Sequence, residues 1–395
     1  MVPKGWEVLH LKDVASKIQD GNYGADYPKA DEFVASGIPF LTSKVIGGIG
    51  TINPDKFDYI KEEKHQSLKK AQIVAGDILF TNRGANVGTI AIVPDYIATA
   101  NIGPQLTLVR CNDCILKEYL FQFLRGSFFQ KQIQQRDSGS AMNFFGIKDT
   151  ERFKVLVPSL SEQKRIAQIL STWDKAISVT EKLLANSQQQ KKALMQQLIT
   201  GKKRLLDENG VRFSGEWVYL TFDNAFIVAN KKSTQVKSSD YLQSGSIPII
   251  DQGQSRIAGY CNNLEVYSDV PVIVFGDHTR CVKWIEFVFC PGADGTQVIK
   301  TSKILEPKLG YYLLSNTDIP NLGYSRHMRE LKEKDFRLPL DIKEQQKIAA
   351  VLSAADAEIS TLEKKLACLR DEKKALMQQL LTGKRRVKVD EAVAE

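Results

Sequence analysis

The chain has 395 residues, of which 43% are hydrophobic and 25% are charged, and its formal net charge is +8. This length exceeds one ordinary hydrophobic core, so two or more domains are expected. The sequence shows no run of about 18 or more apolar residues and no secretory signal, and its six cysteines are scattered. These features argue against a membrane protein or a disulfide scaffold and favour a cytoplasmic location.

Residues 1–157 predict a mixed globule. Short runs rich in β-branched residues, such as IPFLT, GDILF and QLTLVR, alternate with turn residues, and a helix is expected near Leu116–Ile133. Residues 205–338 predict a second globule of the same kind, with a helix near Leu305–Ser315. In each globule we expect a twisted, mainly antiparallel sheet with a few helices.

Faint echoes connect the two globules. Trp6 and Leu9 are spaced like Trp217 and Leu220, GIPFL resembles SIPII, and GDILFTNRG resembles VIVFGDHTR. The order of these segments is the same in both, so the globules are predicted to have diverged from one fold.

Each globule is followed by a copy of one long repeat. The segment that begins at Ser161 aligns without a gap with the segment that begins at Lys343, and KKALMQQL occurs in both, at Lys191–Leu198 and Lys373–Leu380. Residues 158–204 are therefore predicted as a central helix and 339–386 as a distal helix, with a short tail at 387–395. Both copies are basic, with nine basic against three acidic residues over 161–204.

Apolar residues recur in both copies at alternating spacings of four and three, which is typical of a heptad seam. Lys191 and Lys373 fall on the same stripe. The seam residues are Ile166, Leu170, Trp173, Ile177, Leu184, Leu194 and Leu198 in the first copy, and Ile348, Leu352, Ile359, Leu362, Leu366, Leu369, Leu376 and Leu380 in the second. A narrow stripe favours a partner helix.

The repeat itself can supply that partner. We predict an α+β protein in which two mixed globules are separated by two long helices that form an antiparallel intramolecular coiled coil, with pseudo-twofold, cyclic symmetry. In the trial register Trp173 lies beside Lys373 and Lys191 beside Ala355, so that each lysine stem covers an aromatic or a small residue. The alternative is that each helix lies on its own globule.

Motifs for catalysis are largely missing from the sequence. It contains no GxxxxGK[ST], GxSxG or HExxH motif, and no Asn/Asp-Pro-Pro-aromatic tetrad of the kind that grips a flipped base. Pro54-Asp55 with Glu62-Glu63-Lys64 imitates a nuclease motif, but the segment is typical of a polar loop that runs into a helix. Cys111 and Cys114 form a lone CxxC, which is too few ligands for zinc. We expect no metal or cofactor on this chain.

Polar, glycine-flanked segments recur at matching places in the two globules. Their side chains are of the types that contact base edges and phosphates, although surface loops are polar in any case. The candidate DNA-binding residues are Thr42, Ser43, Lys44, Asn82, Arg83, Asn86, Ser140 and Asn143 in the first globule, and Arg256, His278, Arg280, Lys283, Ser325, Arg326 and His327 in the second.

Two diverged globules that alternate with two nearly identical helices resemble the specificity subunit of type I restriction–modification systems. The residues that carry the resemblance are the Glu-Gln openings after Pro158 and Pro339 and the two LMQQL-(I/L)-TGK endings. The resemblance implies that each globule reads one half of a bipartite site in double-stranded DNA and that the coiled coil sets the spacer. It also implies two methyltransferase subunits and further restriction subunits as partners, with S-adenosylmethionine, ATP and Mg²⁺ on those partners.

The identical octapeptide suggests a docking surface that is used twice. The seam does not constrain the outward-facing residues of the octapeptide, yet they recur; they are Lys192, Gln196 and Gln197, and Lys374, Gln378 and Gln379. Recent recombination between the copies is the alternative explanation. Two other functions also stay open on the sequence: a stand-alone nuclease or methyltransferase, and a coiled-coil scaffold for protein interactions.

Overall fold

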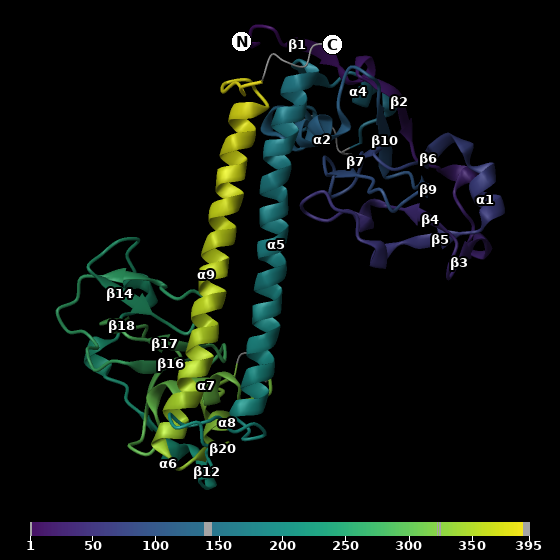
Figure 1. Cartoon of the computed structure of the whole chain (residues 1–395). Helices are drawn as coiled ribbons and strands as arrows, with labels where there is room; N and C mark the ends of the chain where they lie inside the picture. Colours follow the sequence, from purple (N-terminus) through teal and green to yellow (C-terminus); the bar gives the residue numbers. More distant parts are fainter. Residues whose placement is uncertain (1, 138–143, 322, 324, 390–395) are drawn as a thin grey trace. The chain divides into compact units, whose positions relative to one another are not determined.

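The computed structural model describes residues 2–137, 144–321, 323 and 325–389. The chain forms two compact units, Met1–Glu181 with Lys364–Glu395, and Lys182–Glu363. Two helices of 39 residues each, α5 (Leu160–Leu198) and α9 (Ile342–Leu380), contribute to both units (Figure 1). Among the described residues, no helix has the length and apolarity that crossing a membrane requires.

The first unit contains two sheets and a two-stranded ribbon. One sheet is antiparallel, in the order β2 (Ala15–Asp20), β10 (Leu106–Cys111), β7 (Ile78–Thr81) and β8 (Ile90–Ile92). The other has the order β3 (Phe33–Val34), β5 (Asp58–Ile60), β4 (Ile38–Leu41), β9 (Ala100–Ile102) and β6 (Gln72–Ile73). The ribbon pairs β1 (Glu7–His10) with β11 (Lys154–Val157), and the helices are α1 (Glu62–Ser67), α2 (Lys117–Arg125), α3 (Ser127–Asp137) and α4 (Ile147–Glu151).

The second unit repeats this plan. Its antiparallel sheet has the order β13 (Phe226–Val228), β19 (Thr296–Thr301), β16 (Val272–Gly276) and β17 (Val282–Ile285). A smaller sheet has the order β15 (Gly259–Cys261), β14 (Ile247–Ile250) and β18 (Cys290–Pro291). The ribbon pairs β12 (Trp217–Thr221) with β20 (Asp335–Pro339), and the helices are α6 (Phe222–Ala225), α7 (Pro307–Ser315) and α8 (Met328–Lys332).

The strands explain the faint sequence echoes between the globules. GIPFL and SIPII form β4 and β14, and each of these strands has one parallel neighbour, β9 or β18. GDILFTNRG and VIVFGDHTR supply the central strands β7 and β16. The expectation of one sheet in each globule was wrong, because the chain crosses between two small sheets. The helix expected over 116–133 is divided at Gly126, whose added Cβ would lie 3.0 Å from the Leu381 side chain.

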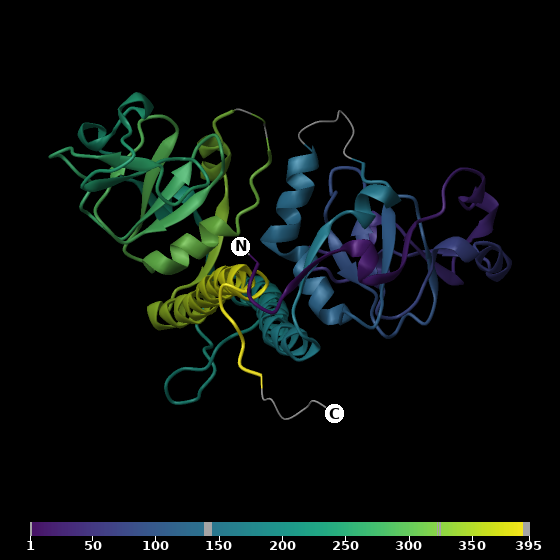
Figure 2. The same ribbon diagram turned by 90° about the horizontal axis from the view of Figure 1, so that it is seen from above.

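Each globule has a core that joins its antiparallel sheet to the long helices. In the first unit, α2 packs on β8, and the same cluster includes Leu170 of α5 and Leu380 of α9. Figure 2 views α5 (teal) and α9 (yellow) nearly along their axes. In the second unit, α7 packs on β17, and Leu198 and Leu352 join the cluster. Some of the helix residues that the heptad pattern identifies therefore pack in the cores of the globules.

Within each unit, α5 and α9 run antiparallel. In the second unit Ser187 Oγ donates to Glu358 Oε1 at 3.0 Å, and in the first unit Arg370 Nη2 donates to Glu181 Oε1 at 2.7 Å. Of the fifteen predicted seam residues, Ile166, Leu170, Ile177, Leu198, Ile348, Leu352, Leu366 and Leu380 are buried and the other seven are half-buried.

The two seam lysines bind carboxylates that directly follow Trp173 and Ala355 in the sequence, which agrees with the trial register, although the carboxylate partners were not predicted. Lys373 Nζ lies 2.5 Å from Asp174 Oδ1, and Lys191 Nζ forms an ion pair with Asp356, the repeat counterpart of Asp174. An ammonium in a helix interface requires a counter-charge, because desolvation otherwise disfavours it. Burial lowers the pKa of Lys373, and so does the charge of Arg125, while Asp174 opposes the shift.

Candidate nucleic-acid interface

The loop after β7 in the first globule is built on a buried polar network. Asn82, which is fully buried, donates from Nδ2 to Thr107 Oγ1 at 2.9 Å and to Asp20 Oδ1 at 3.3 Å. Thr107 Oγ1 donates to the same Asp20 oxygen at 2.6 Å. Burial raises the pKa of Asp20, while the two hydrogen bonds and the charge of Arg83 oppose that shift. The network fixes which side of the Asn82 amide faces outward.

Arg83 lies at the outer end of this network. Its Nε donates to Asn82 Oδ1 at 3.2 Å, and its guanidinium carbon lies 4.4 Å from the centre of the Phe144 ring. Phe144 is 47% exposed, whereas the adjacent Phe145 is buried beside Phe80 and donates its backbone N–H to Asn82 O at 2.9 Å. The guanidinium is therefore held at one nitrogen and on one face.

The polar segment after β4 reaches the same neighbourhood through Gln105. Ser43 Oγ donates a hydrogen bond to the side-chain oxygen of Gln105, Oε1, at 2.9 Å. The backbone N–H of Asn82 donates to the backbone carbonyl oxygen of Gln105 at 3.0 Å. Lys44 is exposed and forms an ion pair with Asp58 at 2.7 Å. The segments around Ser43 and Asn82, which lie far apart in the sequence, are thus brought together through one residue.

The second globule has a corresponding loop after β16. Asp277 is buried, and its Oδ1 accepts from the Met328 N–H at 2.7 Å. The His327 N–H donates to Asp277 O at 2.8 Å, and Asp277 N donates to Gly295 O at 2.7 Å. The same backbone arrangement holds Asn82 in the first globule, through Phe145 and Gln105. Both globules thus fasten the loop after their central strand in one way.

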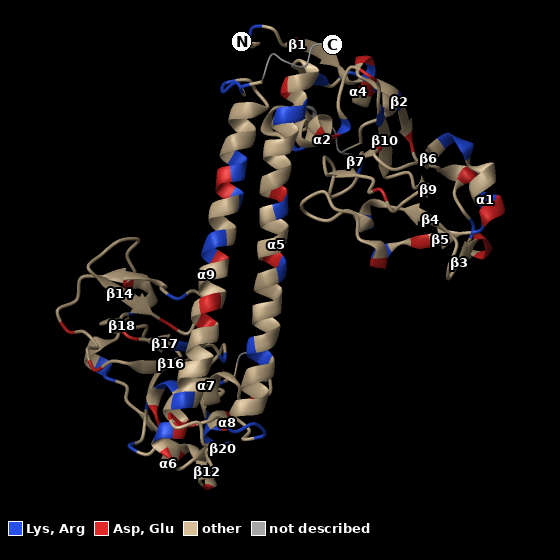
Figure 3. Ribbon diagram, viewed as in Figure 1, with Lys and Arg blue, Asp and Glu red and all other residues tan. Residues whose placement is uncertain are grey.

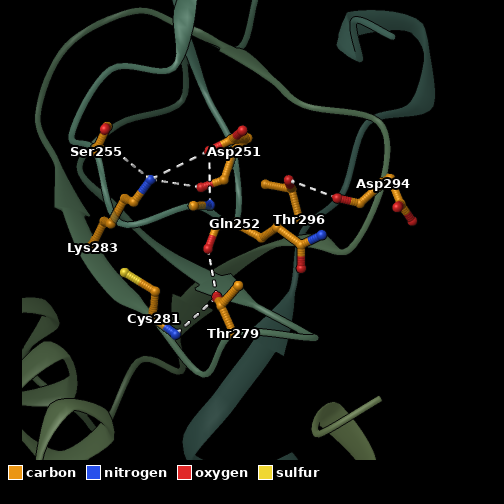
Figure 4. Close-up of polar contacts among 9 residues, drawn as sticks. Asp251, Gln252, Ser255, Thr279, Cys281, Lys283, Asp294 and Thr296 are labelled. Carbon is orange, nitrogen blue, oxygen red and sulfur yellow. Dashed lines mark hydrogen bonds and ion pairs between the residues drawn. The ribbon is translucent and has the colours of Figure 1, made fainter. Parts of the chain in front are cut away.

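Lys283 organises the neighbouring loop of the second globule (Figure 4). Its buried ammonium donates to the carbonyl oxygens of Asp251 at 2.7 Å and of Ser255 at 2.6 Å. Burial lowers the pKa of Lys283, and the Asp251 carboxylate, 3.7 Å away, opposes the shift. Gln252 belongs to the same loop; its side-chain oxygen accepts from the His278 N–H at 3.1 Å. The loop that carries Arg256 is fixed from within.

Arg280 holds a further segment of the second globule. Among the described non-glycine residues, Arg280 is the one with a positive φ, 61°. Residues other than glycine rarely adopt this backbone conformation. Arg280 Nη1 donates to Ile319 O at 2.8 Å, and its backbone N–H donates to Gly276 O at 2.7 Å. The side-chain contact ties the segment that leads to Arg326 and His327 to the loop after β16, and the backbone contact closes the turn of that loop.

The candidate DNA-binding residues therefore divide into two groups. Asn82, Lys283 and His327 are buried and bonded inside the protein, so in this conformation they position loops and do not present their polar groups to solvent. Residues that are exposed or half-buried are Thr42, Ser43, Lys44, Arg83, Asn86, Arg256, His278, Arg280, Ser325 and Arg326. Ser140 and Asn143 lie outside the described residues.

Sequence reasoning missed Asp20 and Phe144, and it noticed Gln252 only as part of the polar segment that leads to Arg256. Asp20 is the last residue of β2, and Gln252 lies two residues after the end of β14; a polar residue at a strand end could have drawn attention to both. Phe144 had no such signal, because its pairing with Arg83 joins segments about 60 residues apart.

The outward residues of the repeated octapeptide are all exposed. Lys192, Gln196 and Gln197 on α5 and Lys374, Gln378 and Gln379 on α9 lie on the solvent side of their helices. Basic and acidic residues alternate along both long helices (Figure 3). The repeated amides form two identical neutral-to-basic patches within this charged surface.

A metal centre finds no support in the described part of the chain, where no group of three or more His, Cys, Asp or Glu side chains is placed to hold an ion. Cys111 is half-buried, Cys114 is exposed, and neither is in a disulfide. The segment that imitates a nuclease motif forms a turn at Asp55 and then α1.

Comparison with known proteins finds similarity to one family. The model of the type I restriction modification DNA specificity domain matches residues 3–186. A putative type I restriction enzyme MjaX specificity subunit from Methanocaldococcus jannaschii is 27% identical over 98% of this chain and 95% of its own length. The chain is thus similar over nearly its whole length to a specificity subunit of a type I restriction enzyme, and its residues 3–186 carry the match to the DNA specificity domain.

Two solved structures share the fold of this chain. The S subunit from M. genitalium has a TM-score of 0.63 at 15% identity, covering 96% of this chain and 99% of its own. A chain from a study of complex assembly and conformational transition of the type I system has a TM-score of 0.54 at 18% identity, covering 98% and all of its length. The fold of this chain is thus shared with proteins that have little sequence identity to it.

Proposed function

We propose that this chain is a specificity subunit that recognises a bipartite, asymmetric site in double-stranded DNA, with one half-site read by each globule. The observation that carries the proposal is the shared construction of the two loop regions: in each globule the segment after the central strand is fastened by the same backbone hydrogen bonds. The side chains that stand on these fastened segments differ, Arg83 in one and His278 in the other. One scaffold with different side chains would read different bases.

The paired helices would set the spacer between the half-sites. Two readers that approach the same side of a duplex favour half-site centres about one helical turn apart, ~34–36 Å, which corresponds to a spacer of roughly 5–8 base pairs. The carboxylates that bind Lys373 and Lys191 support a fixed helix register, because a slip would leave buried charges unpaired. A fixed register gives a fixed spacer.

Catalysis would reside in other subunits. We propose that two methyltransferase subunits dock on the repeated patches around Gln196 and Gln378, and that restriction subunits join them. S-adenosylmethionine, ATP and Mg²⁺ would be bound by those partners. The repeat supports this stoichiometry, because two identical exposed surfaces fit two copies of one protein.

Reconstitution tests this division of labour. The purified chain should transfer no methyl group to duplex DNA with S-adenosylmethionine, and the same chain combined with the methyltransferase subunit of its system should modify the DNA at a split motif. Methyl transfer or cleavage by the chain alone, with Mg²⁺ present, would contradict the proposal. Binding to the partner without any DNA recognition would favour a protein-interaction scaffold.

A further inference from the structure

We propose that Arg83 reads a guanine of the first half-site and that Phe144, Asn82 and Asp20 hold its guanidinium in the reading orientation. The inference rests on the proposed function and adds to it a contact residue, a base, and a set of positioning residues. It comes from the contacts of one side chain at the surface of the first globule.

The guanidinium of Arg83 is held by the protein at two places, its Nε group and one face of its plane. Nε is occupied by Asn82 Oδ1 at 3.2 Å, and one face lies against the Phe144 ring at 4.4 Å. None of the described residues accepts a hydrogen bond from Nη1 or Nη2. These two groups form the remaining edge of a planar fork, with their donors aimed away from Asn82.

That edge matches guanine better than it matches other bases. In the major groove guanine presents two acceptors, O6 and N7, side by side, and paired donors from one arginine satisfy both. Adenine presents an acceptor next to a donor, so one of the two Nη donors would face an amino group. A fork held at Nε and on one face therefore discriminates, because it cannot rotate to avoid the mismatch.

The network behind Arg83 determines the orientation of the Asn82 amide. Asp20 as a carboxylate only accepts hydrogen bonds, so it holds the Asn82 Nδ2 group toward itself and turns Oδ1 toward Arg83. Thr107 donates to Asp20 and accepts from Asn82, which closes the network. Asp20 and Thr107 are buried and would not touch DNA. They are positioning residues.

A simple phosphate contact would not need this arrangement. A phosphate attracts a cation from many directions, and a flexible lysine at the surface serves that purpose. Here three buried polar groups and an aromatic ring hold the plane of the Arg83 guanidinium. A network of buried polar groups is unfavourable unless each group in it has its hydrogen-bond partners. The construction is therefore better suited to reading a base than to neutralising a phosphate.

The test uses the reconstituted complex and a duplex library in which each position of the first half-site is varied in turn. Arg83→Gln and Arg83→Lys should both reduce the preference for a G·C pair at one position by roughly 10- to 100-fold, while the second half-site stays unchanged. Phe144→Leu, which removes the ring but keeps apolar bulk, and Asp20→Asn should weaken the preference at that same position by smaller factors. Arg152→Gln, at an exposed arginine of the same globule, serves as the control and should leave every position unchanged.

Several outcomes would overturn the proposal. If Arg83→Lys retains the full preference, the residue supplies charge alone. If neither substitution alters the motif while thermal unfolding shows folded protein, Arg83 reads nothing. If the changed position prefers a base pair other than G·C in the unsubstituted complex, the assignment to guanine fails. A failure of the proposed function looks different, because the unsubstituted complex would then select no split motif at all.

Discussion

Replacing Glu344 with glutamine is expected to destabilise the second unit by about 2–4 kcal/mol, since removing one member of a buried ion pair leaves the other uncompensated. The Glu344 side chain is 1% exposed and forms two hydrogen bonds with Arg204, from Nε at 2.5 Å and from Nη2 at 2.7 Å. Arg204 also donates to Gly215 O at 3.0 Å and lies over the Trp217 ring at 5.6 Å. One carboxylate therefore ties the start of α9 to the segment that follows α5.

Calorimetry should show this loss as a lower transition temperature of the second unit, by roughly 6–12 °C for a unit of this size. Glu363→Gln, at an exposed glutamate of the same helix, is the control and should change little. The repeat supplies a graded comparison. Glu162 pairs with Arg386 in the same way, but the Arg386 side chain is 45% exposed, so Glu162→Gln should cost less than Glu344→Gln. Equal effects, or no effect at Glu344, would contradict this account.

Changing the four repeated glutamines, Gln196, Gln197, Gln378 and Gln379, to glutamate is expected to abolish stable assembly with the methyltransferase subunit. Glutamate has no amide N–H group to donate to an acceptor on the partner subunit. A polar group of the partner that is left unpaired in the interface weakens binding by about 1–3 kcal/mol. All four side chains are exposed, so both helices should stay folded, with unchanged helical circular dichroism. Sedimentation velocity of the mixture measures the assembly directly.

A matched control for this experiment lies about two helical turns away. Gln189 and Gln190 are exposed on α5, and the equivalent positions on α9 are Asp371 and Glu372, so a repeated partner surface cannot require an amide there. Gln189→Glu with Gln190→Glu should leave assembly intact. If the repeated glutamines prove equally dispensable, the identical octapeptide reflects helix pairing or recombination and no docking surface.

The long helices were the most predictable part of this chain. A heptad pattern that persists over more than four heptads predicts a long helix strongly, and the two copies support each other. The helices α5 and α9 accordingly begin and end within a few residues of the repeat. The partners of Lys191 and Lys373 were not predictable in the same way. Asp174 and Asp356 lie next to the seam, and only the structure shows that the buried Lys373 and the half-buried Lys191 turn toward them.

The globules were predictable in kind but not in detail. Strand periodicity located β4, β7, β14 and β16, but it carries no information on which strands pair, and the division into two small sheets could not be seen. Polar residues after strands were correctly noticed, yet the sequence does not separate a buried polar side chain from an exposed one. Asn82 and Lys283 therefore looked like surface residues, although their polar atoms bind neighbouring loops.

Exchange of residues 1–157 tests the central claim most directly. The domain would be replaced by the corresponding globule of another specificity subunit, and modified bases would then be located by long-read sequencing in cells that carry the full set of subunits. One half of the recognition motif should change to new bases, while the other half and the spacer between them stay as they were. A motif in which both halves change, or neither does, would contradict the assignment of one half-site to each globule.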